Sequence, residues 1–190
     1  MLRRIIADPR LPVILFRIDC DLAREVKAKG CPFCKGRLHS ARYPRKVRCE
    51  KDLPQSWDLR FSFCCAEEGC RKRTTPPSVR FFGRRLYPAA VVVLLCALSQ
   101  GAPPRRLSVL RSALGVDRRT VARWRKWWIE TFPETGFFKK VRDRFLPPLD
   151  RNALPLSLLL RFGKIALEGL VSLLRFLTDQ FPNAPPDRNR

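Results

Sequence analysis

Four cysteines are arranged in two pairs whose spacing suits a metal ion. The first pair lies in Cys31-Pro32-Phe33-Cys34, and the second pair is Cys65 and Cys70. Two thiols on one tight turn can bind a metal while backbone amides donate to the sulfurs. Four thiolates from two such turns close a tetrahedral zinc site and leave no position for water. We therefore expect one structural zinc ion, held by Cys31, Cys34, Cys65 and Cys70.

One member of the second pair is ambiguous, because Cys64 and Cys65 are neighbours. Adjacent residues of a strand point to opposite faces of a sheet, so one of these two thiols faces away from the metal. Cys65 shares a face with Phe61 and Phe63, and it makes the tighter turn with Cys70. We favour Cys65 over Cys64 as the ligand.

Two other residues are alternative ligands. Cys49 lies between the two pairs, and His39 is the single histidine of the chain. We interpret His39 as a surface residue among basic neighbours, and Cys20 and Cys96 as small core residues in apolar segments. A cysteine hydrolase or a zinc deaminase needs a histidine or glutamate beside its nucleophile or metal. With one histidine and no HxE motif, the sequence favours a protein that is not an enzyme.

A second chemical feature is a set of polar residues on a predicted DNA-reading helix. Apolar residues at helical spacing predict two helices that pack together across a sharp turn at Gly115. These apolar residues are Leu107, Leu110, Leu114, Val116, Val121 and Trp124. The outer side of the second helix then carries Arg118, Arg119, Thr120 and Arg123. In a helix-turn-helix these turns enter the major groove, where arginine bonds guanine or phosphate. The alternative is a basic helical hairpin that makes no groove contact.

Basic residues also gather between Glu68 and Asp117, an interval without any acidic residue. They are Arg71, Lys72, Arg73, Arg80, Arg84, Arg85, Arg105, Arg106 and Arg111. A surface without acids suits contact with phosphates, although an ordinary solvated surface is the alternative. We expect the following arginines to contact DNA phosphates: Arg71, Arg73, Arg84 and Arg85.

The overall charge indicates the same class of partner. The chain of 190 residues has 39 Lys and Arg against 17 Asp and Glu, a formal charge of +22. Self-repulsion of this size calls for an acidic partner, and we favour nucleic acid over an anionic membrane. Because 45% of the residues are hydrophobic, the chain can bury a core and is not a disordered basic tail.

We expect neither a membrane span nor a signal peptide. No apolar run reaches the ~20 residues that cross a bilayer. Polar residues also interrupt the apolar stretch near the N-terminus, where a signal peptide needs an unbroken one. The protein is therefore expected in the reducing cytoplasm, where clustered cysteines bind metal rather than form disulfides.

The elements that must position these residues make an α+β protein. We expect a short extended piece followed by a helix that is capped by Asp21 and ends at Gly30. A strand is expected through residues 60–65. Helices are expected at 89–99, at 105–114, from a cap at Asp117 to residue 131, and in two shorter pieces at 155–161 and 165–177.

This order predicts a small zinc ribbon followed by a three-helix helix-turn-helix unit and C-terminal helices. The predicted parts are an N-terminal extension (1–30), the zinc ribbon (31–85), the helix-turn-helix (86–135), a C-terminal helical segment (136–182) and a disordered tail (183–190). The last helix has a wide apolar face made of Leu167, Leu170, Val171, Leu174 and Leu177. This face either packs on the three-helix unit or pairs with a second copy or a catalytic partner, as in dimers that read two half-sites.

Three segments carry a resemblance to a known class of proteins. They are Cys31-Pro32-Phe33-Cys34, the stretch from Phe63 to Arg73, and the stretch from Thr75 to Gly83. With the helix-turn-helix, they resemble the DNA-recognition part of bacterial insertion-sequence transposases that join a zinc ribbon to a helix-turn-helix. The likeness covers residues 31–130 and implies double-stranded DNA as the partner.

The resemblance stops before the catalytic part of such transposases. That part binds two metal ions through widely spaced acidic residues. The residues after Glu134 include few acids and are too few for such a domain. We therefore expect a sequence-specific DNA-binding protein without catalysis, either transposon-associated or a transposase recognition module that stands alone. Two rivals stay open: an RNA-binding or ribosome-associated zinc-ribbon protein, and a transposase or nuclease with catalytic residues of another kind.

Overall fold

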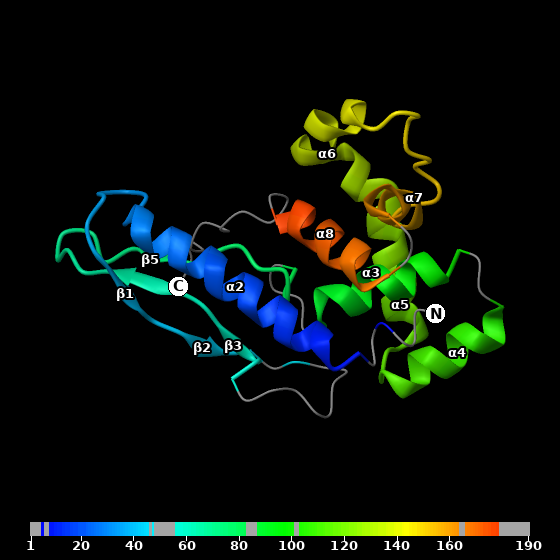
Figure 1. Cartoon of the computed structure of the whole chain (residues 1–190), viewed down its shortest axis with the longest axis horizontal. Coiled ribbons are helices and arrows are strands. Elements are labelled where there is room, and N and C mark those ends of the chain that lie inside the picture. The colour runs from blue at the N-terminus through cyan, green and yellow to red at the C-terminus, as the bar shows by residue number, and fades with distance from the viewer. Residues whose placement is uncertain are drawn as a thin grey trace.

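Stretches of strand type and of helix type occupy different parts of this sequence, and the structure keeps them apart in space. The computed structural model describes residues 5, 8–45, 47, 56–82, 87–100, 103–163 and 166–178. We call residues 31–45 and 56–74 the sheet region, and the described residues from 87 to 178 the helical region. The two regions lie at opposite ends of the molecule (Figure 1). The predicted α+β class is thereby confirmed.

A long helix, α2 (Arg10–Lys29), runs along the sheet region and reaches the helical region (Figure 1). It begins after Pro9 and ends at Gly30, whose φ of 72° suits a residue without a side chain. Its buried residues are Leu11, Leu15, Ile18, Asp19 and Ala23. Apolar residues at this spacing form one stripe on a helix, and this stripe holds α2 against the rest of the chain.

The prediction for the start of this helix was wrong. Asp21 was expected to cap a short helix, but it lies in the middle of α2. Its carboxylate pairs there with the Arg24 guanidinium at 2.8 Å, and both side chains are exposed. The helical spacing of apolar residues already begins at Leu11, so the expected extended piece is helical as well. The predicted end at Gly30 is confirmed.

The sheet region contains two small antiparallel sheets. Three strands pair in the order β1 (Leu38–Ser40), β4 (Phe63–Cys65) and β5 (Arg73–Thr74), and two others pair as β2 (Tyr43–Pro44) and β3 (Leu59–Arg60). In the first sheet, Cys64 stands opposite His39 on one side and Arg73 on the other. Side chains alternate along strands, so these three lie on one face of the sheet, whereas Phe63 and Cys65 are buried on the other.

The strand predicted through residues 60–65 is interrupted. β3 ends at Arg60 and β4 begins at Phe63. Arg60, Phe61, Ser62 and Phe63 are all buried, which a strand with one solvated face does not allow. The chain therefore leaves the ladder at residues 61 and 62 and passes from one sheet to the other.

The helical region is built around α3 (Ala89–Leu98), in which every residue from Ala89 to Ala97 is buried. α4 (Pro104–Ala113) and α5 (Arg118–Lys126) pack against it, and they follow the predicted positions closely. Gly115 has a φ of 60° in the turn between α4 and α5. The Asp117 carboxylate accepts the Arg119 backbone N–H at 2.7 Å, which confirms the predicted cap. In the described parts of the chain, no helix combines the length and the apolar character needed to cross a membrane, α3 included.

Short helices complete this region. A π-helical turn (Trp127–Thr131) continues α5 and is followed by a 3₁₀ turn (Phe132–Glu134), α6 (Gly136–Val141), a 3₁₀ turn (Arg142–Arg144), α7 (Leu156–Leu159), a 3₁₀ turn (Leu160–Phe162) and α8 (Leu167–Leu177). Trp128 and Phe132 are fully buried between these elements and α3, with ring centroids 4.8 Å apart. The chain from α5 onwards therefore wraps the α3 core.

Of the two interpretations of the apolar face on α8, packing within the chain is confirmed. Leu167, Leu170, Leu174 and Leu177 are buried in the chain's own core, and Val171 packs at its edge. α8 contacts both α3 and α7. An apolar face this wide covers the apolar surface of α3, so it is not available to a second copy or to a catalytic partner.

Two hydrophobic cores result, and α2 belongs to both. Leu11, Leu15 and Ile18 belong to the large core of the helical region, while Ala23 belongs to the small core of the sheet region. Because one helix contributes to both cores, the two regions are joined by packed side chains as well as by the covalent chain.

Candidate metal centre and nucleic-acid interface

The first cysteine pair lies on a tight turn that follows α2 directly. The backbone N–H of Cys31 donates to the Gly36 carbonyl at 2.9 Å, and the N–H of Lys35 donates to the Cys31 carbonyl at 2.8 Å. Lys35 has a φ of 64°, the left-handed conformation that closes such a turn. A side chain at Gly30 would come within 2.7 Å of the Lys35 carbonyl oxygen. Gly30 therefore ends α2 and also lets the turn fold back closely enough to present both thiols.

The second pair comes from a similar turn between β4 and β5. The N–H of Cys70 and the N–H of Arg71 both donate to the Glu67 carbonyl at 3.0 Å. Arg71 has a φ of 44°. The N–H of Cys65 donates to the Lys72 carbonyl at 3.0 Å and ties the start of the turn to its end. Both turns thus fix the backbone around their cysteines by main-chain hydrogen bonds.

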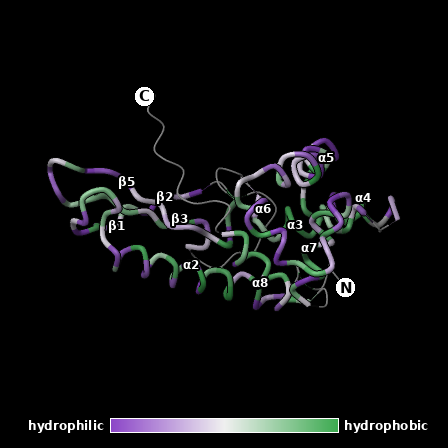
Figure 2. Tube along the Cα trace, turned by 90° about the horizontal axis from the view of Figure 1, so that it is seen from above, coloured by the Kyte–Doolittle hydropathy of each residue, from purple (hydrophilic) through white to green (hydrophobic). Residues whose placement is uncertain are grey.

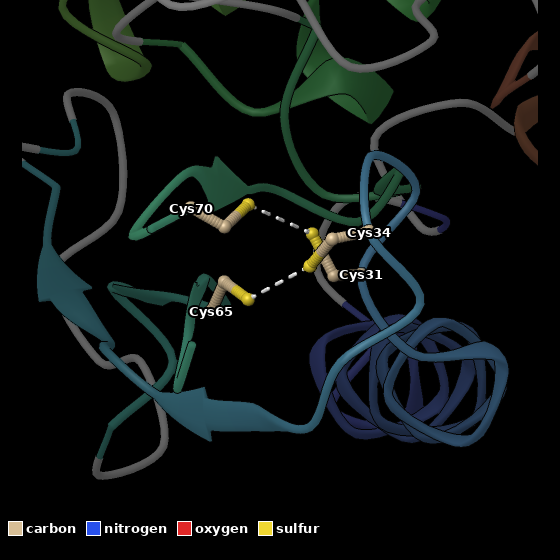
Figure 3. Close-up of side chains that lie close together, drawn as sticks. All are labelled: Cys31, Cys34, Cys65 and Cys70. Atoms are coloured by element: carbon tan, nitrogen blue, oxygen red, sulfur yellow. Dashed lines mark hydrogen bonds between the residues drawn. The ribbon is translucent and has the colours of Figure 1, made fainter. Parts of the chain in front are cut away.

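The two turns face each other and bring four sulfurs together (Figure 3). The Sγ atoms of Cys31 and Cys70 are 3.7 Å apart, those of Cys34 and Cys65 are 3.4 Å apart, and all four lie within 4.8 Å of one another. Cys31 and Cys65 are buried, whereas Cys34 is exposed. This arrangement can hold one metal ion with four sulfur ligands.

The structure gathers Cys65 into this cluster and leaves Cys64 outside it. Cys64 lies on the opposite face of β4, where its thiol is 3.4 Å from the Arg71 carbonyl oxygen. His39 is exposed and is not part of the cluster, as we expected, and Cys96 is buried in α3. Cys49, the alternative ligand, lies outside the described residues.

The sulfurs of the cluster differ in how readily they lose a proton. Burial acts against the thiolate of Cys31, but the backbone N–H groups of Cys34 and Phe33 donate to its sulfur, and its pKa is lowered to about 7. Burial raises the pKa of Cys65 to about 12. Sulfurs this close repel one another as thiolates, so a divalent cation is needed to keep all of them charged.

The second candidate surface lies on α5. Arg118, Arg119 and Arg123 are exposed, while Val121 and Trp124 on the opposite side are buried. Trp124 packs edge-on against Tyr87 with ring centroids 4.9 Å apart, and α5 contacts α3 along its inner side. These contacts fix the rotation of α5 about its own axis. The three guanidinium groups therefore extend from one outward face of a rigid helix.

The expected outward orientation of Thr120 is wrong. Its side chain is buried, and its hydroxyl accepts a hydrogen bond from the Arg123 guanidinium at 3.3 Å. Thr120 precedes Trp124 by four positions, so both lie on the same stripe of the helix. In this place the hydroxyl orients Arg123 and does not extend outward with the arginines.

The arginines predicted to contact phosphates differ in where the structure places them. Arg71 and Arg73 are exposed, and the Arg73 guanidinium lies 5.9 Å from the centroid of the Tyr43 ring. Arg84 and Arg85 lie outside the described residues. Arg80, which was counted with the same basic surface, is fully buried and cannot contact a phosphate.

Arg80 instead forms a buried ion pair with Asp19, which sequence reasoning missed. The Arg80 Nε atom donates to the Asp19 carboxylate at 2.7 Å, and neither side chain is exposed. The same carboxylate accepts the Val79 backbone N–H at 2.7 Å, and the Arg80 guanidinium donates to the carbonyls of Trp57 and Leu59. A buried charge with this many partners is a structural joint between α2 and the segment after β5.

Arg80 stands as a single charge within an apolar segment, Val79-Arg80-Phe81-Phe82, and that isolation is a signal in the sequence that it is buried with a partner. Asp19 gives no such signal, because Arg17 and Asp21 flank it two positions away.

A second feature missed from sequence is Phe33, at the tip of the first cysteine turn. It is 54% exposed, and the Lys72 ammonium lies 4.3 Å from its ring centroid. The sequence interpretation of Cys31-Pro32-Phe33-Cys34 used the two cysteines and assigned no role to Phe33.

Comparisons of this chain with protein-family models, with curated proteins and with solved structures give no match.

Proposed function

We propose that this protein binds double-stranded DNA, with α5 entering the major groove as the recognition helix of a helix-turn-helix formed by α4 and α5 on α3. A zinc ion held by the four clustered cysteines stabilises the sheet region and takes no part in chemistry. We infer that it is a transposon-associated DNA-binding protein, because residues 31–130 resemble the DNA-recognition part of insertion-sequence transposases.

One observation carries this proposal: Arg118, Arg119 and Arg123 are exposed on a helix whose other side is buried. The first two lie in the first turn of α5, directly after the tight turn at Gly115. This is the part of a recognition helix that meets base edges. A helix N-terminus also favours phosphate, because its free N–H groups point along the axis.

The charge of the whole chain supports a polyanionic partner. The formal charge is +22, and no acidic residue lies between Asp117 and Glu130, the interval that contains the basic residues of α5. Within the described residues, the ion pair on α5 is that of Lys126 with Glu130 at 3.6 Å, and it lies at the C-terminal end of the helix. The arginines of the first turns are therefore left to an external partner.

Zinc is the metal that suits four cysteine sulfurs best. Zn–S bonds of ~2.3 Å in a tetrahedron separate the sulfurs by about 3.8 Å. The two Sγ–Sγ distances of 3.7 Å and 3.4 Å are close to that edge. Four protein ligands leave no open position for a substrate or a water molecule, so the ion has a structural role.

We propose no catalytic activity for this chain. Incubation with a DNA duplex and Mg²⁺ or Mn²⁺ is expected to give neither cleavage nor strand transfer. Reproducible cleavage that is lost in Asp143→Asn or Asp150→Asn protein would show that a transposase or nuclease is the better interpretation.

Selection of binding sites from random duplexes tests the proposed function. We expect enrichment of a defined motif, and retention of the bound duplex when structured RNA is added as competitor. If no motif is enriched, sequence-specific recognition of a duplex is contradicted. If structured RNA displaces the duplex at equal phosphate concentration, an RNA-binding protein is favoured.

A further inference from the structure

The sheet region and α5 both carry exposed arginines, and in Figure 2 α5 lies on the side of the molecule opposite to α2 and α8. In the same view the strands of the sheet region lie on that side of α2. This arrangement raises the question of whether the two surfaces act on one partner. The inference below rests on the proposed function.

In the sheet region, the pairing register defines which side chains face away from α2. Phe63 and Cys65 face inward and join the small core to which Ala23 of α2 belongs. Cys64 therefore faces outward, and Arg73, paired with Cys64, lies on the same outward face. Arg73 is exposed, and so is Arg71 two positions before it. Lys72, between them, is directed to the first cysteine turn, where its ammonium lies 4.3 Å from the Phe33 ring centroid. The outward face thus carries Arg73, which directly follows the turn of Cys65 and Cys70.

In the helical region, the inner side of α5 packs on α3, so its outer side faces away from the core. Figure 2 places α5 on the side of the molecule opposite to α2 and α8. The exposed Arg118, Arg119 and Arg123 extend from that outer side. The outer side of α5 and the outward face of the sheet therefore both lie away from α2.

The two regions that carry these surfaces are joined by α2. Its 20 residues make a helix ~30 Å long, comparable to one turn of B-DNA at ~34 Å. Leu11, Leu15 and Ile18 of α2 are buried in the large core, and Ala23 is buried in the small core. The buried pair of Asp19 with Arg80 lies between these two contacts and ties α2 to the segment that leads out of the sheet region. A connection with this much packing does not act as a flexible tether.

We propose that the sheet region is a second DNA-binding surface, and that it and α5 contact one duplex about one helical turn apart, as a rigid two-part clamp. α5 reads base edges, while Arg73 and its basic neighbours bind phosphates of the same duplex. The zinc ion contributes by fixing the turn that carries Arg71 and leads into β5. Because the frame is rigid, the sheet region contacts the duplex only when the DNA offers phosphates at the matching distance from the α5 site.

Hydroxyl-radical footprinting of the full chain on its selected duplex tests this proposal. We expect two protected segments about one turn (~10 base pairs) apart. Arg73→Ala should remove protection at one segment and reduce the slope of log K against log salt by about 1, whereas Arg119→Ala should weaken the other segment. Arg17→Ala is a matched control, because Arg17 is an exposed arginine on α2. It should keep both segments.

Insertions between the two protected segments test rigidity. An insertion of about half a turn (~5 base pairs) moves one contact to the far side of the duplex, and an insertion of a full turn (~10 base pairs) moves it out of reach of a rigid frame. Both should weaken binding to the level of the Arg73→Ala protein. Tolerance of the full-turn insertion, or a single protected segment that Arg73→Ala does not change, would overturn the clamp while leaving duplex binding intact. Failure to bind any duplex would instead overturn the proposed function.

Discussion

The sheet region and the helical region differ in the size and composition of their hydrophobic cores. The buried residues of the small core are Ala23, Cys31, Leu38, Phe61, Phe63 and Cys65, whereas the large core includes all of α3 from Ala89 to Ala97 and most of α8. Two members of the small core are cysteines of the cluster. A core this small stabilises a fold weakly, and a structural metal is the usual supplement.

The two regions also differ in how their cores relate to their exposed basic residues. In the helical region, burial of α3 fixes the fold, so the outer side of α5 is free to carry charged residues. In the sheet region, the clustered cysteines lie within or next to the same turns that present Phe33, Arg71 and Lys72. Loss of the metal should therefore disturb the surface of the sheet region and leave the helical core folded.

Metal removal is expected to have the largest effect. A structural zinc contributes ~10 kcal/mol or more to the folding of small domains. Chelation, or Cys31→Ser, should release one zinc ion per chain and expose Trp57, which is buried beside the sheets. Zinc analysis combined with tryptophan fluorescence and circular dichroism checks this, and most of the helical signal should persist.

Cys64→Ser is the matched control for that experiment, because Cys64 neighbours Cys65 but lies outside the cluster. This variant should retain its zinc ion. Well-folded wild-type protein without zinc would refute the metal centre, and zinc loss in Cys64→Ser equal to that in Cys65→Ser would refute the ligand assignment.

Replacement of Asp19 is expected to have the next largest effect, because it acts on the buried joint between α2 and the segment after β5. Asp19→Asn keeps the shape of the side chain but leaves the buried Arg80 guanidinium without a counter-charge. Breaking a buried pair in this way costs ~3–5 kcal/mol. Urea unfolding should show the loss, and the double variant Asp19→Leu/Arg80→Met should recover much of it. A double variant as unstable as the single one would indicate that packing, not charge, holds the joint.

A smaller effect is expected at the cap of α5. The N–H of Arg119 donates to the Asp117 carboxylate and lowers the pKa of that carboxyl below its usual range. A carboxyl whose pKa is lowered by folding stabilises the native state above its unfolded pKa, and this contribution is lost as the pH falls through the folded pKa.

The matching experiment compares wild-type protein with Asp117→Asn, since asparagine also caps helices but does not titrate. Between about pH 5 and pH 2, the thermal midpoint of the wild-type protein should fall more than that of the variant. Parallel curves would mean that the charge of Asp117 adds nothing to the cap.

The elements predicted correctly from the sequence were those specified by local signals. The continuous apolar run of α3, the glycine at position 115 and the cap at Asp117 each act within a few residues, and all appear in the structure. The choice of Cys65 over Cys64 also followed from a local rule, the alternation of side chains along a strand.

The features that were missed depend on residues far apart in the chain. Asp19 and Arg80 are separated by 61 positions, so neither neighbourhood alone reveals the other partner. The basic residues were treated as one surface, although Arg80 is buried. The apolar face of α8 gave no indication of what covers it, because a face that packs internally and a face that binds a second copy have the same pattern.

Thr120 was grouped with the outward arginines of α5, and this part of the prediction was wrong. Helix geometry places Thr120 on the stripe of Trp124, four positions later. Position on the helix therefore predicts orientation on α5 better than polarity does.

Binding of a selected duplex and of a scrambled duplex by Arg119→Ala protein tests the role of α5 most directly. If Arg119 contacts a base edge, its loss should cost ~1–3 kcal/mol on the selected duplex and much less on the scrambled one, so that the preference between them shrinks. Arg17→Ala, from the exposed surface of α2, should preserve that preference. Equal losses of affinity on both duplexes would contradict base reading by α5 and leave a protein that binds nucleic acid through charge alone.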